Sequence, residues 1–214
     1  DLQSLYNSIT DFKPEIIFHL AAQPLVQHSY ENPLETYETN IMGTVNLLEV
    51  AKKCNLLKSI ICITSDKCYE NHETYCGYKE TDKMGGFDPY SCSKGASELI
   101  ISSYFKSYFN DLKIGLASAR SGNVVGGGDW SQNRLFPDII RSIENKENIR
   151  VRNPNAIRPW QHVLEPLSGY IMLAQNLYKD YERYSEGWNF GPDPEQIKSV
   201  QINRQYFSIW LPKL

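Results

Sequence analysis

Three short apolar runs, separated by stretches with helical periodicity, constrain the fold of this chain most strongly. The runs are EIIFHLAA at 15–22, KSIICIT at 58–64 and KIGLASAR at 113–120, and residues 34–54 and 90–109 between them have the pattern of helices. Runs of this kind suit strands that are buried on both faces of a parallel sheet. Because strand and helix alternate, we expect right-handed crossovers and helices on both faces. The sequence therefore predicts an α/β, doubly wound parallel sheet.

Regions outside these runs predict further elements. Apolar residues at spacings of three and four predict a helix over 1–12, which Pro14 ends. After the third run we expect helices over 137–143 and 164–178, and a short strand in NIRVRNP at 148–154. The glycine-rich run GNVVGGGDW is interpreted as a loop on the substrate side. A phosphate-binding turn would need the opening of a helix after its glycines, whereas polar residues follow here.

Charge and cysteine content exclude several classes of protein. The formal net charge is -3, which argues against a polyanion-binding surface, so we expect no nucleic-acid partner. No apolar run approaches the roughly 20 residues of a membrane helix, and we expect no membrane partner. An odd number of cysteines without CxxC spacing argues against a zinc site or a disulfide framework and favours reduced thiols in a cytoplasm. The cysteines are Cys54, Cys62, Cys68, Cys76 and Cys92.

The motif YSCSK places Tyr90 and Lys94 four residues apart at the start of a predicted helix, so both side chains share one face. A lysine cation beside a phenol favours the phenolate and lowers the phenol pKa from its usual value near 10. Such a tyrosine can take a proton from a hydroxyl while hydride leaves the same carbon. A tyrosine and a lysine at this spacing also occur by chance on surface helices, so the motif needs support from elsewhere.

Support comes from TSDKCYE at 64–70, which follows the second apolar run. Ser65, Asp66 and Lys67 are expected at the carboxyl edge of the sheet, where Tyr90 is also expected and where such folds bind ligands. A hydroxyl, an acid and an amine in one turn can supply a hydrogen bond, a general acid and a general base. The alternative is a solvated Asp-Lys turn on the surface, which the position at a strand end disfavours.

Together, FHLAAQ, TSDK, YSCSK and SARSGNVVGGGDW resemble the extended short-chain dehydrogenase/reductase superfamily. From about Pro14 to Pro192, the runs AAQPLVQHSYENP, TSDKCYEN, NVVGGGDW and RPWQHVLEPL are similar to the CDP-glucose 4,6-dehydratase branch of its sugar-nucleotide dehydratases. The related dTDP-glucose and GDP-mannose dehydratases typically carry an acidic pair in the first loop, whereas here Lys67 follows Asp66. The resemblance implies a Rossmann-like fold and NAD as the cofactor.

The resemblance also implies roles for individual residues. Tyr90 and Lys94 would be the catalytic pair, and Ser65 would hydrogen-bond the 4-hydroxyl of the sugar. Asp66 and Lys67 would act as acid and base in the elimination of water.

Binding roles follow from the same motifs. The residues implied at the cofactor are Ala21, Ala22, Gln23 and Thr64, together with Tyr90 and Lys94. Asn123 and Arg158 would contact the nucleotide diphosphate of the substrate, with Arg134 a weaker candidate. Arginine suits this role because its planar guanidinium meets phosphate oxygens in pairs. No metal ion is expected.

The reaction implied by the resemblance converts CDP-D-glucose to CDP-4-dehydro-6-deoxy-D-glucose and water. Its product is a precursor of deoxysugars in cell-surface polysaccharide, such as the O-antigen of lipopolysaccharide. One alternative is another dehydratase or an epimerase of the superfamily. Epimerases need only the Tyr-Lys pair and a hydroxyl residue, so the presence of Asp66 and Lys67 argues against an epimerase. The other alternative is a catalytically inactive fragment. A homodimer is expected by analogy with the superfamily.

The chain departs from the family pattern at both ends. No GxxGxxG motif occurs, and the resemblance would place this pyrophosphate-binding turn before Asp1, so we expect the first strands of the sheet to be missing. After NFGP at 189–192 the sequence no longer resembles the family. We expect a partial NAD-binding Rossmann-like domain over 1–122. A smaller mixed substrate-binding lobe is expected over 123–192, allowing for segments that return to the sheet, followed by an atypical tail over 193–214.

Overall fold

The computed structural model describes residues 1–72, 77–193 and 198–200. These residues form two compact units. The first unit consists of residues 1–121 and 167–190, and the second consists of residues 122–166 with the described residues from 191 onwards. The chain therefore leaves the first unit after its third strand and returns to it at residue 167.

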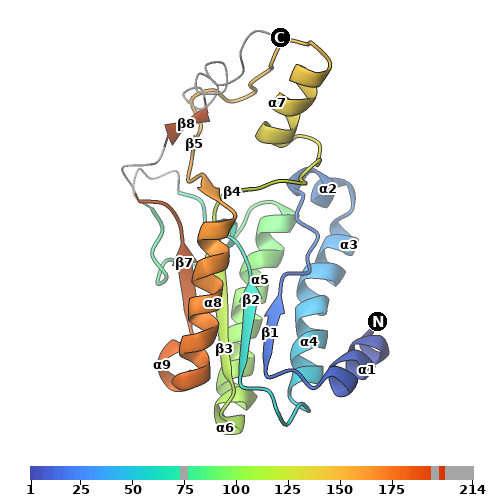
Figure 1. The fold of residues 1–214 in the computed structure, drawn as a ribbon, viewed down its shortest axis with the longest axis vertical. Coiled ribbons are helices and arrows are strands. Elements are labelled where there is room, and N and C mark those ends of the chain that lie inside the picture. Colours follow the sequence, from blue (N-terminus) through green and yellow to red (C-terminus); the bar gives the residue numbers. More distant parts are fainter. Residues whose placement is uncertain (73–76, 194–197, 201–214) are drawn as a thin grey trace. The chain divides into compact units, whose positions relative to one another are not determined.

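A four-stranded parallel sheet forms the centre of the first unit (Figure 1). Its strands are β1 (Ile16–His19), β2 (Ser59–Ile63), β3 (Gly115–Ser121) and β7 (Gly187–Phe190), in the order β1-β2-β3-β7. The three predicted strands are confirmed, and β7 is an addition that the sequence pattern did not indicate. In this order the carboxyl ends of all four strands lie at one edge of the sheet.

Helices α4 (Gly43–Ala51) and α5 (Pro89–Tyr104) cover one face of this sheet. Leu48 and Ile101 from these helices pack against Ile60 of β2 in one buried cluster. Full burial of an aliphatic side chain contributes about 1.5–3 kcal/mol, so this cluster holds the helices firmly on the strands.

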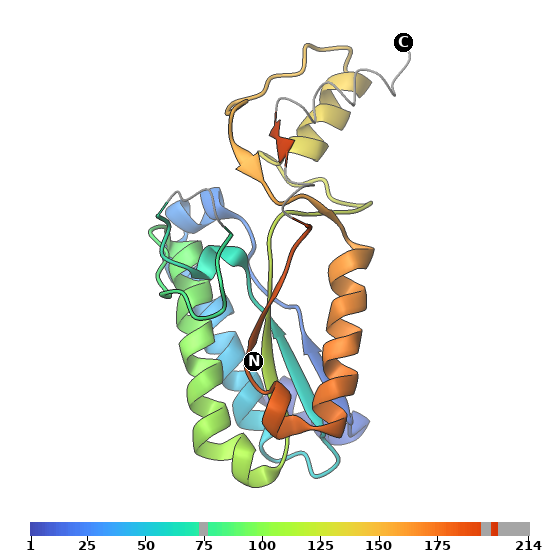
Figure 2. The same cartoon turned by 90° about the vertical axis from the view of Figure 1, so that its left-hand side faces the viewer.

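Helix α8 (Leu164–Lys179) covers the opposite face, as Figure 2 shows. Its Leu173 and Leu177 lie in a second buried cluster with Ile61 of β2 and Ala117 of β3. Successive residues Ile60 and Ile61 thus point into different clusters, as expected for a strand that is buried on both sides. The predicted doubly wound α/β fold is confirmed.

The remaining helical elements connect and extend these layers. Two of the predicted helices contain a five-residue π-helical turn within an otherwise continuous helical run. The elements are α1 (Leu2–Phe12), α2 (Val26–Glu31), α3 (Pro33–Tyr37), the π turns η1 (Glu38–Met42) and η3 (Phe105–Phe109), the 3-10 turn η2 (Asp66–Cys68), α6 (Asn110–Leu112) and α9 (Tyr181–Tyr184). Among the described residues, no helix combines the length and apolar character that crossing a bilayer requires.

The described residues of the second unit include two small strand pairs and helix α7 (Leu135–Glu144). Strand β4 (Val124–Val125) pairs in parallel with β6 (Gln161–His162). Strand β5 (Ile157–Arg158) pairs antiparallel with β8 (Lys198–Ser199). The helix predicted at 137–143 is confirmed within α7.

The strand predicted in NIRVRNP at 148–154 is wrong, because these residues join no ladder. The run instead enters a turn in which the Ala156 amide donates to the Asn153 carbonyl oxygen at 3.2 Å. Asn153 and Pro154 favour such a turn. The strand begins only at Ile157, where β8 supplies a partner.

Candidate active site

Helix α5 begins directly at the YSCSK motif, and its first turn places Tyr90 and Lys94. Asp88 caps the helix by accepting hydrogen bonds from the Ser91 amide at 2.9 Å and the Ser91 hydroxyl at 2.6 Å. Pro89 occupies the first helical turn, where its missing N–H costs nothing. Tyr90 is 8% exposed and Lys94 is 6% exposed, so both candidate catalytic side chains lie at the edge of the core.

The Lys94 ammonium lies beneath the end of strand β2. It donates to the Ile63 carbonyl oxygen at 3.2 Å, and Nζ lies 6.0 Å from the centre of the Tyr90 ring. Burial lowers the pKa of Lys94 to about 8, although Cys62 and Glu98 favour its charged form. A lysine with this pKa is still mostly a cation at pH 7 and can favour a neighbouring phenolate.

The second candidate motif forms the turn that follows β2. Ser65 is buried, and its hydroxyl accepts from the Lys67 amide at 3.2 Å and donates to Asp66 Oδ1 at 3.0 Å. These contacts hold residues 66–68 in the single 3-10 turn η2. The Lys67 side chain is exposed, whereas Asp66 is partly buried. The turn therefore presents a hydroxyl, a carboxylate and an amine within three successive residues.

Gly95 brings the two motifs together. A Cβ atom on Gly95 would lie 3.1 Å from the Cys68 carbonyl oxygen, which is closer than most real Cβ contacts. Because Gly95 lacks this atom, helix α5 lies directly against η2. The structure thus places Tyr90 and Lys94 on the helix that packs against the Ser65–Lys67 turn.

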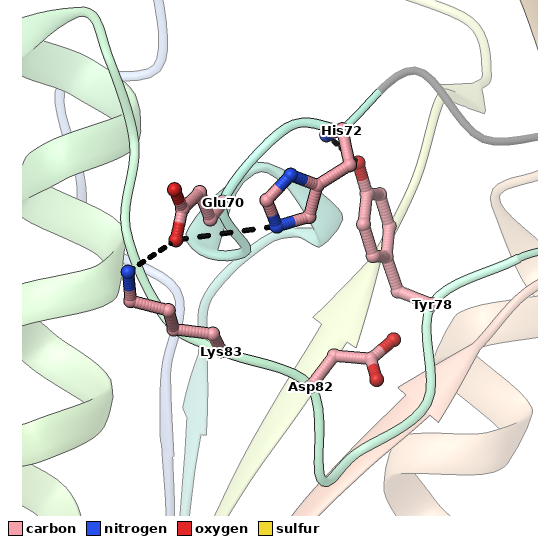
Figure 3. A pocket seen from close by; sticks show the side chains of 5 residues that line it. All are labelled: Glu70, His72, Tyr78, Asp82 and Lys83. Atoms are coloured by element: carbon pink, nitrogen blue, oxygen red, sulfur yellow. Dashed lines mark hydrogen bonds and ion pairs between the residues drawn. The ribbon is translucent and has the colours of Figure 1, made fainter.

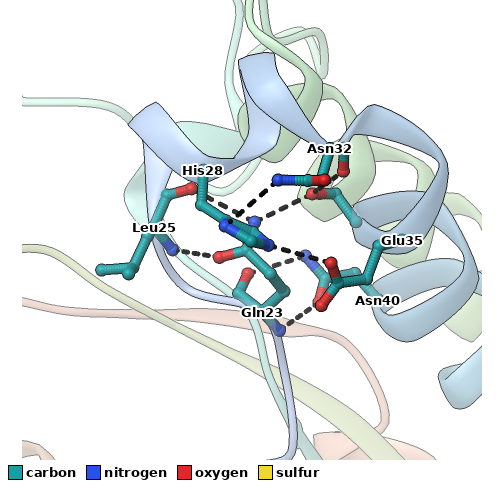
Figure 4. A network of polar contacts seen from close by, with 7 residues as sticks. Gln23, Leu25, His28, Asn32, Glu35 and Asn40 are labelled. Atoms are coloured by element: carbon teal, nitrogen blue, oxygen red, sulfur yellow. Dashed lines mark hydrogen bonds and ion pairs between the residues drawn. The ribbon is translucent and has the colours of Figure 1, made fainter.

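The loop after β1 carries three of the six residues predicted to lie near the cofactor. Ala21 is exposed and Ala22 is partly exposed, whereas Gln23 is buried. Figure 4 shows the polar network around Gln23. The backbone amide of Gln23 donates to Asn40 Oδ1 at 2.8 Å, and its side-chain Nε2 donates to the Thr36 hydroxyl at 2.8 Å. Hydrogen bonds of Gln23 therefore fix this loop to the helical segment that carries Thr36 and Asn40.

The same network reaches the candidate catalytic helix. Asn40 Nδ2 donates to the Gln23 carbonyl oxygen at 3.1 Å and to the Ser93 hydroxyl at 2.9 Å. Ser93 in turn donates to the Tyr90 carbonyl oxygen at 2.7 Å. The loop after β1 and the first turn of α5 are thus joined through buried polar contacts. Sequence reasoning did not identify Asn40 or Ser93, because neither stands out without its partners.

A buried ion pair beneath the site was also missed. Arg120 Nη2 lies 2.7 Å from Glu98 Oε2, and the two side chains are 6% and 5% exposed. The other carboxylate oxygen of Glu98 accepts a hydrogen bond from the Thr64 hydroxyl. Thr64, a predicted cofactor residue, thus directs its hydroxyl into the protein. The sequence held a signal for Glu98, because it lies one helical turn after Lys94 on the same face, but none for its pairing with Arg120.

A polar surface pocket lies in the loop that follows η2 (Figure 3). Lys83 Nζ lies 2.6 Å from Glu70 Oε2 and lowers the pKa of that carboxyl group. The Glu70 amide also donates to the Lys83 carbonyl oxygen at 2.9 Å, so both contacts close the loop upon itself. The residues that line the pocket are Glu70, His72, Tyr78, Asp82 and Lys83.

The candidate substrate residues lie in the second unit. The Asn123 carbonyl oxygen accepts from the Gln161 amide at 3.0 Å, which holds the start of β4. Arg134 Nη1 lies 2.9 Å from Asp129 Oδ2. Arg158 is exposed, and its Nη1 donates to the Ile157 carbonyl oxygen at 2.8 Å. The structure therefore brings the catalytic candidates together in the first unit and holds these three by local contacts in the second.

Comparison with solved structures supports the fold. A dTDP-glucose 4,6-dehydratase from Streptomyces venezuelae, solved with NAD bound, matches with a TM-score of 0.80 at 20% identity, covering 98% of this chain and 59% of that one. A UDP-glucose 4-epimerase from Thermotoga maritima matches with a TM-score of 0.81 at 20% identity, covering 98% and 65%. At such identities the likeness concerns the fold alone.

Sequence comparison gives nearer relatives. A CDP-glucose 4,6-dehydratase from Salmonella typhimurium is 58% identical over 207 residues, which cover 94% of this chain and 58% of that protein. A CDP-paratose 2-epimerase from Salmonella typhi is 35% identical over 195 residues, covering 80% and 56%. The chain thus spans little more than half the length of these relatives. A family model described as GDP-mannose 4,6 dehydratase matches residues 1–187. With most of its length matched by this model, the chain belongs to the GDP-mannose 4,6 dehydratase family.

Proposed function

We propose that the protein dehydrates CDP-D-glucose, in an NAD-dependent reaction, to CDP-4-dehydro-6-deoxy-D-glucose and water. The observation that carries this proposal is the packing of helix α5, which bears Tyr90 and Lys94, against the η2 turn that contains Asp66 and Lys67. The 58% identity to a CDP-glucose 4,6-dehydratase supports the choice of substrate.

The Tyr90 phenolate would take the proton of the sugar 4-hydroxyl, which Ser65 holds by a hydrogen bond, and would become the neutral phenol. The buried Lys94 cation favours the phenolate that accepts this proton. Oxidation at carbon 4 produces a ketone, which makes the proton on carbon 5 acidic. Tyr90 therefore acts in the first step, before any carbon–oxygen bond is broken.

Elimination of water would then use the other two residues of the turn. The Lys67 amine takes the carbon 5 proton, and the Asp66 carboxyl group protonates the hydroxyl that leaves carbon 6. Their positions in one short turn suit removal of groups from adjacent carbons. The exposed side chain of Lys67 is compatible with a base that reaches a bound ligand.

The residues at the edge of the sheet fit a dinucleotide cofactor. Ala21 and Ala22 have small, accessible side chains in the loop after β1, so a flat ring can approach the backbone there. Tyr90 and Lys94 would contact its nicotinamide riboside, and Thr64 would flank it. When bound, the cofactor would supply a hydride acceptor for carbon 4 in its oxidised form and a hydride donor for carbon 6 in its reduced form.

Substrate binding is assigned to the second unit. Asn123, Arg134 and Arg158 would contact the nucleotide diphosphate, because guanidinium groups pair well with phosphate oxygens. We further propose a homodimer and a cytoplasmic location. The cytoplasmic location is supported by the free thiols of the described cysteines, whereas Cys76 lies outside the described residues.

The test is turnover by the full-length gene product with CDP-glucose, dTDP-glucose and GDP-mannose, each supplied with NAD+. Mass spectrometry should detect loss of one water molecule from CDP-glucose at the highest rate. A preference for either other nucleotide would refute the substrate and leave the reaction class intact. Inversion at a sugar carbon without loss of water would instead favour an epimerase, the activity named for the 35% identical relative.

A further inference from the structure

The buried ion pair holds both ends of the candidate catalytic turn. Thr64 lies immediately before the Ser65–Cys68 turn, and its hydroxyl donates to Glu98. Tyr69 lies immediately after the turn, and its hydroxyl accepts from Arg120 Nη1 at 2.7 Å. Each member of the pair thus binds the hydroxyl of one residue that flanks the turn.

The same pair links the turn to helix α5 and strand β3. Glu98 lies on α5 two helical turns after Tyr90, and Arg120 lies on β3. One turn earlier on the helix, Lys94 donates to the carbonyl oxygen of Ile63 at 3.2 Å. Helix α5 therefore binds the last residue of β2, Ile63, and the residue that follows it, Thr64.

Stability alone is a weak reason for this arrangement. Removing two charges from water costs several kcal/mol per ion, and buried pairs are often no better than apolar side chains of similar size. Here the carboxylate of Glu98 binds three groups, including the Ser118 hydroxyl at 2.6 Å, so the pair has a fixed geometry. Fixed geometry matters most where catalytic groups must be placed, because a misplacement of about 1 Å can cost roughly 100-fold in rate.

We propose that Glu98 and Arg120 are positioning residues that hold the Ser65–Lys67 turn against Tyr90 through the hydroxyls of Thr64 and Tyr69. This proposal rests on the dehydratase function proposed above. Neither charged residue contacts the reacting atoms in this scheme; each acts on a residue next to the catalytic turn.

The test removes single hydroxyl groups, because a change of Glu98 itself leaves a buried charge and can unfold the protein. Thr64→Val removes the hydroxyl that Glu98 binds at one end of the turn, and Tyr69→Phe removes the hydroxyl at the other end. Ser118→Ala is the matched control, since it removes a hydrogen bond to the same carboxylate from a strand that does not carry the turn.

With CDP-glucose, Thr64→Val and Tyr69→Phe should each lower kcat by roughly 10- to 100-fold. The KM values for sugar nucleotide and NAD+ should stay within about 3-fold, and Ser118→Ala should keep kcat within about 3-fold. Thr64→Ser, which restores the hydroxyl, should recover most of the activity. A Ser118→Ala variant as slow as Thr64→Val, or a Thr64→Val variant as fast as wild type, would overturn the proposal.

A second measurement does not depend on activity. The Cys68 amide donates to the Ser65 carbonyl oxygen at 3.1 Å, so its hydrogen exchange reports on the turn. Exchange should become about 10-fold faster in Thr64→Val and stay close to wild type in Ser118→Ala. If wild-type protein leaves CDP-glucose unchanged, the dehydratase proposal fails, while this exchange comparison still decides the positioning role. Equal exchange in the two variants would refute that role.

Discussion

Helix α5 passes so close to the Cys68 carbonyl oxygen that a Cβ atom on Gly95 would lie 3.1 Å from it. An alanine at this position would push the helix and the η2 turn apart by a few tenths of an ångström. We expect Gly95→Ala to lower kcat by about 10-fold, because Tyr90 moves with the helix. Its free energy of unfolding should change little, because alanine is about 1 kcal/mol better than glycine in a helix and this gain offsets the strain of the contact with Cys68. Steady-state kinetics and denaturant unfolding measure the two effects.

Gly43 provides the matched control. It has helical backbone angles, with φ -59 and ψ -43, and a Cβ atom there would meet nothing within 4 Å. Gly43→Ala should therefore stabilise the protein by about 0.5–1 kcal/mol and leave kcat unchanged. Equal kinetics in the two alanine variants would show that the contact between Gly95 and Cys68 does not place the catalytic groups.

Tyr90 and Lys67 should fail at different steps of the proposed reaction. Tyr90→Phe removes the group that takes the hydroxyl proton, so the absorbance of reduced nicotinamide should not rise in a single turnover with CDP-glucose. Lys67→Met keeps the length of the side chain and removes the base. It should permit the first oxidation and then stall, since loss of a general base costs on the order of 100- to 10,000-fold.

Exchange of the carbon 5 proton with deuterated solvent separates the possibilities for Lys67. The Lys67→Met variant should exchange this proton far more slowly than wild type, although it still oxidises carbon 4. Exchange at the normal rate would mean that Lys67 is not the base. Asp66, which lies beside it in the same turn, would then be the next candidate to replace.

Burial of Lys94 should appear in the dependence of stability on pH. Its pKa is about 8 in the folded protein, against 10.5 as its ordinary value. Between these values the unfolded chain holds the proton that the folded protein has released, so this group makes stability rise with pH. The difference in unfolding free energy between wild type and Lys94→Met should therefore shift by about 3 kcal/mol in favour of wild type from pH 8 to 10.5. A difference that stays constant over this window would contradict the lowered pKa.

Substitution of Gly187 should destabilise the protein nearly as much as loss of the ion pair beside it. A Cβ atom on Gly187 would lie 2.0 Å from Arg120 Nη2, so an alanine must displace the guanidinium from Glu98. We expect Gly187→Ala to cost about 3–5 kcal/mol of unfolding free energy, as breaking a buried pair does. Gly191→Ala, where a Cβ atom would meet nothing within 4 Å, should stay within about 0.5 kcal/mol. Similar denaturation midpoints for both variants would exclude this displacement.

The central strands and helices could be predicted because their residues are buried along a regular pattern. Ile60 and Ile61 belong to a run that is apolar on both faces, which is typical of an inner parallel strand. Strand β7 has no such run, because all four of its residues are partly exposed and one of them is the polar Asn189. It is recognised only by its pairing with β3. The strand predicted at 148–154 failed for the same reason, because its local pattern suited a strand but the structure shows these residues in no ladder within the described part of the chain.

The candidate site shows a similar division. Ser65, Asp66, Lys67, Tyr90 and Lys94 stand in short motifs whose chemistry can be named from the residue types, and their catalytic roles stay predictions. Glu98 and Arg120 could not be paired from the sequence, because a glutamate in a helix usually faces water. Their pairing depends on the packing of α5 against β3, and Arg120 lies 22 residues after Glu98 in the chain.

The Arg120 guanidinium binds Glu98 and lies against Gly187, so these three positions constrain one another in evolution. A substitution that removes the charge of Glu98 or Arg120 leaves the other charge uncompensated, and one that adds a side chain at Gly187 fills the space that the guanidinium needs. Each one-step path away from this trio therefore passes through an impaired ancestor. Lineages should retain all three residues together or replace them together, even while surface residues around them drift freely.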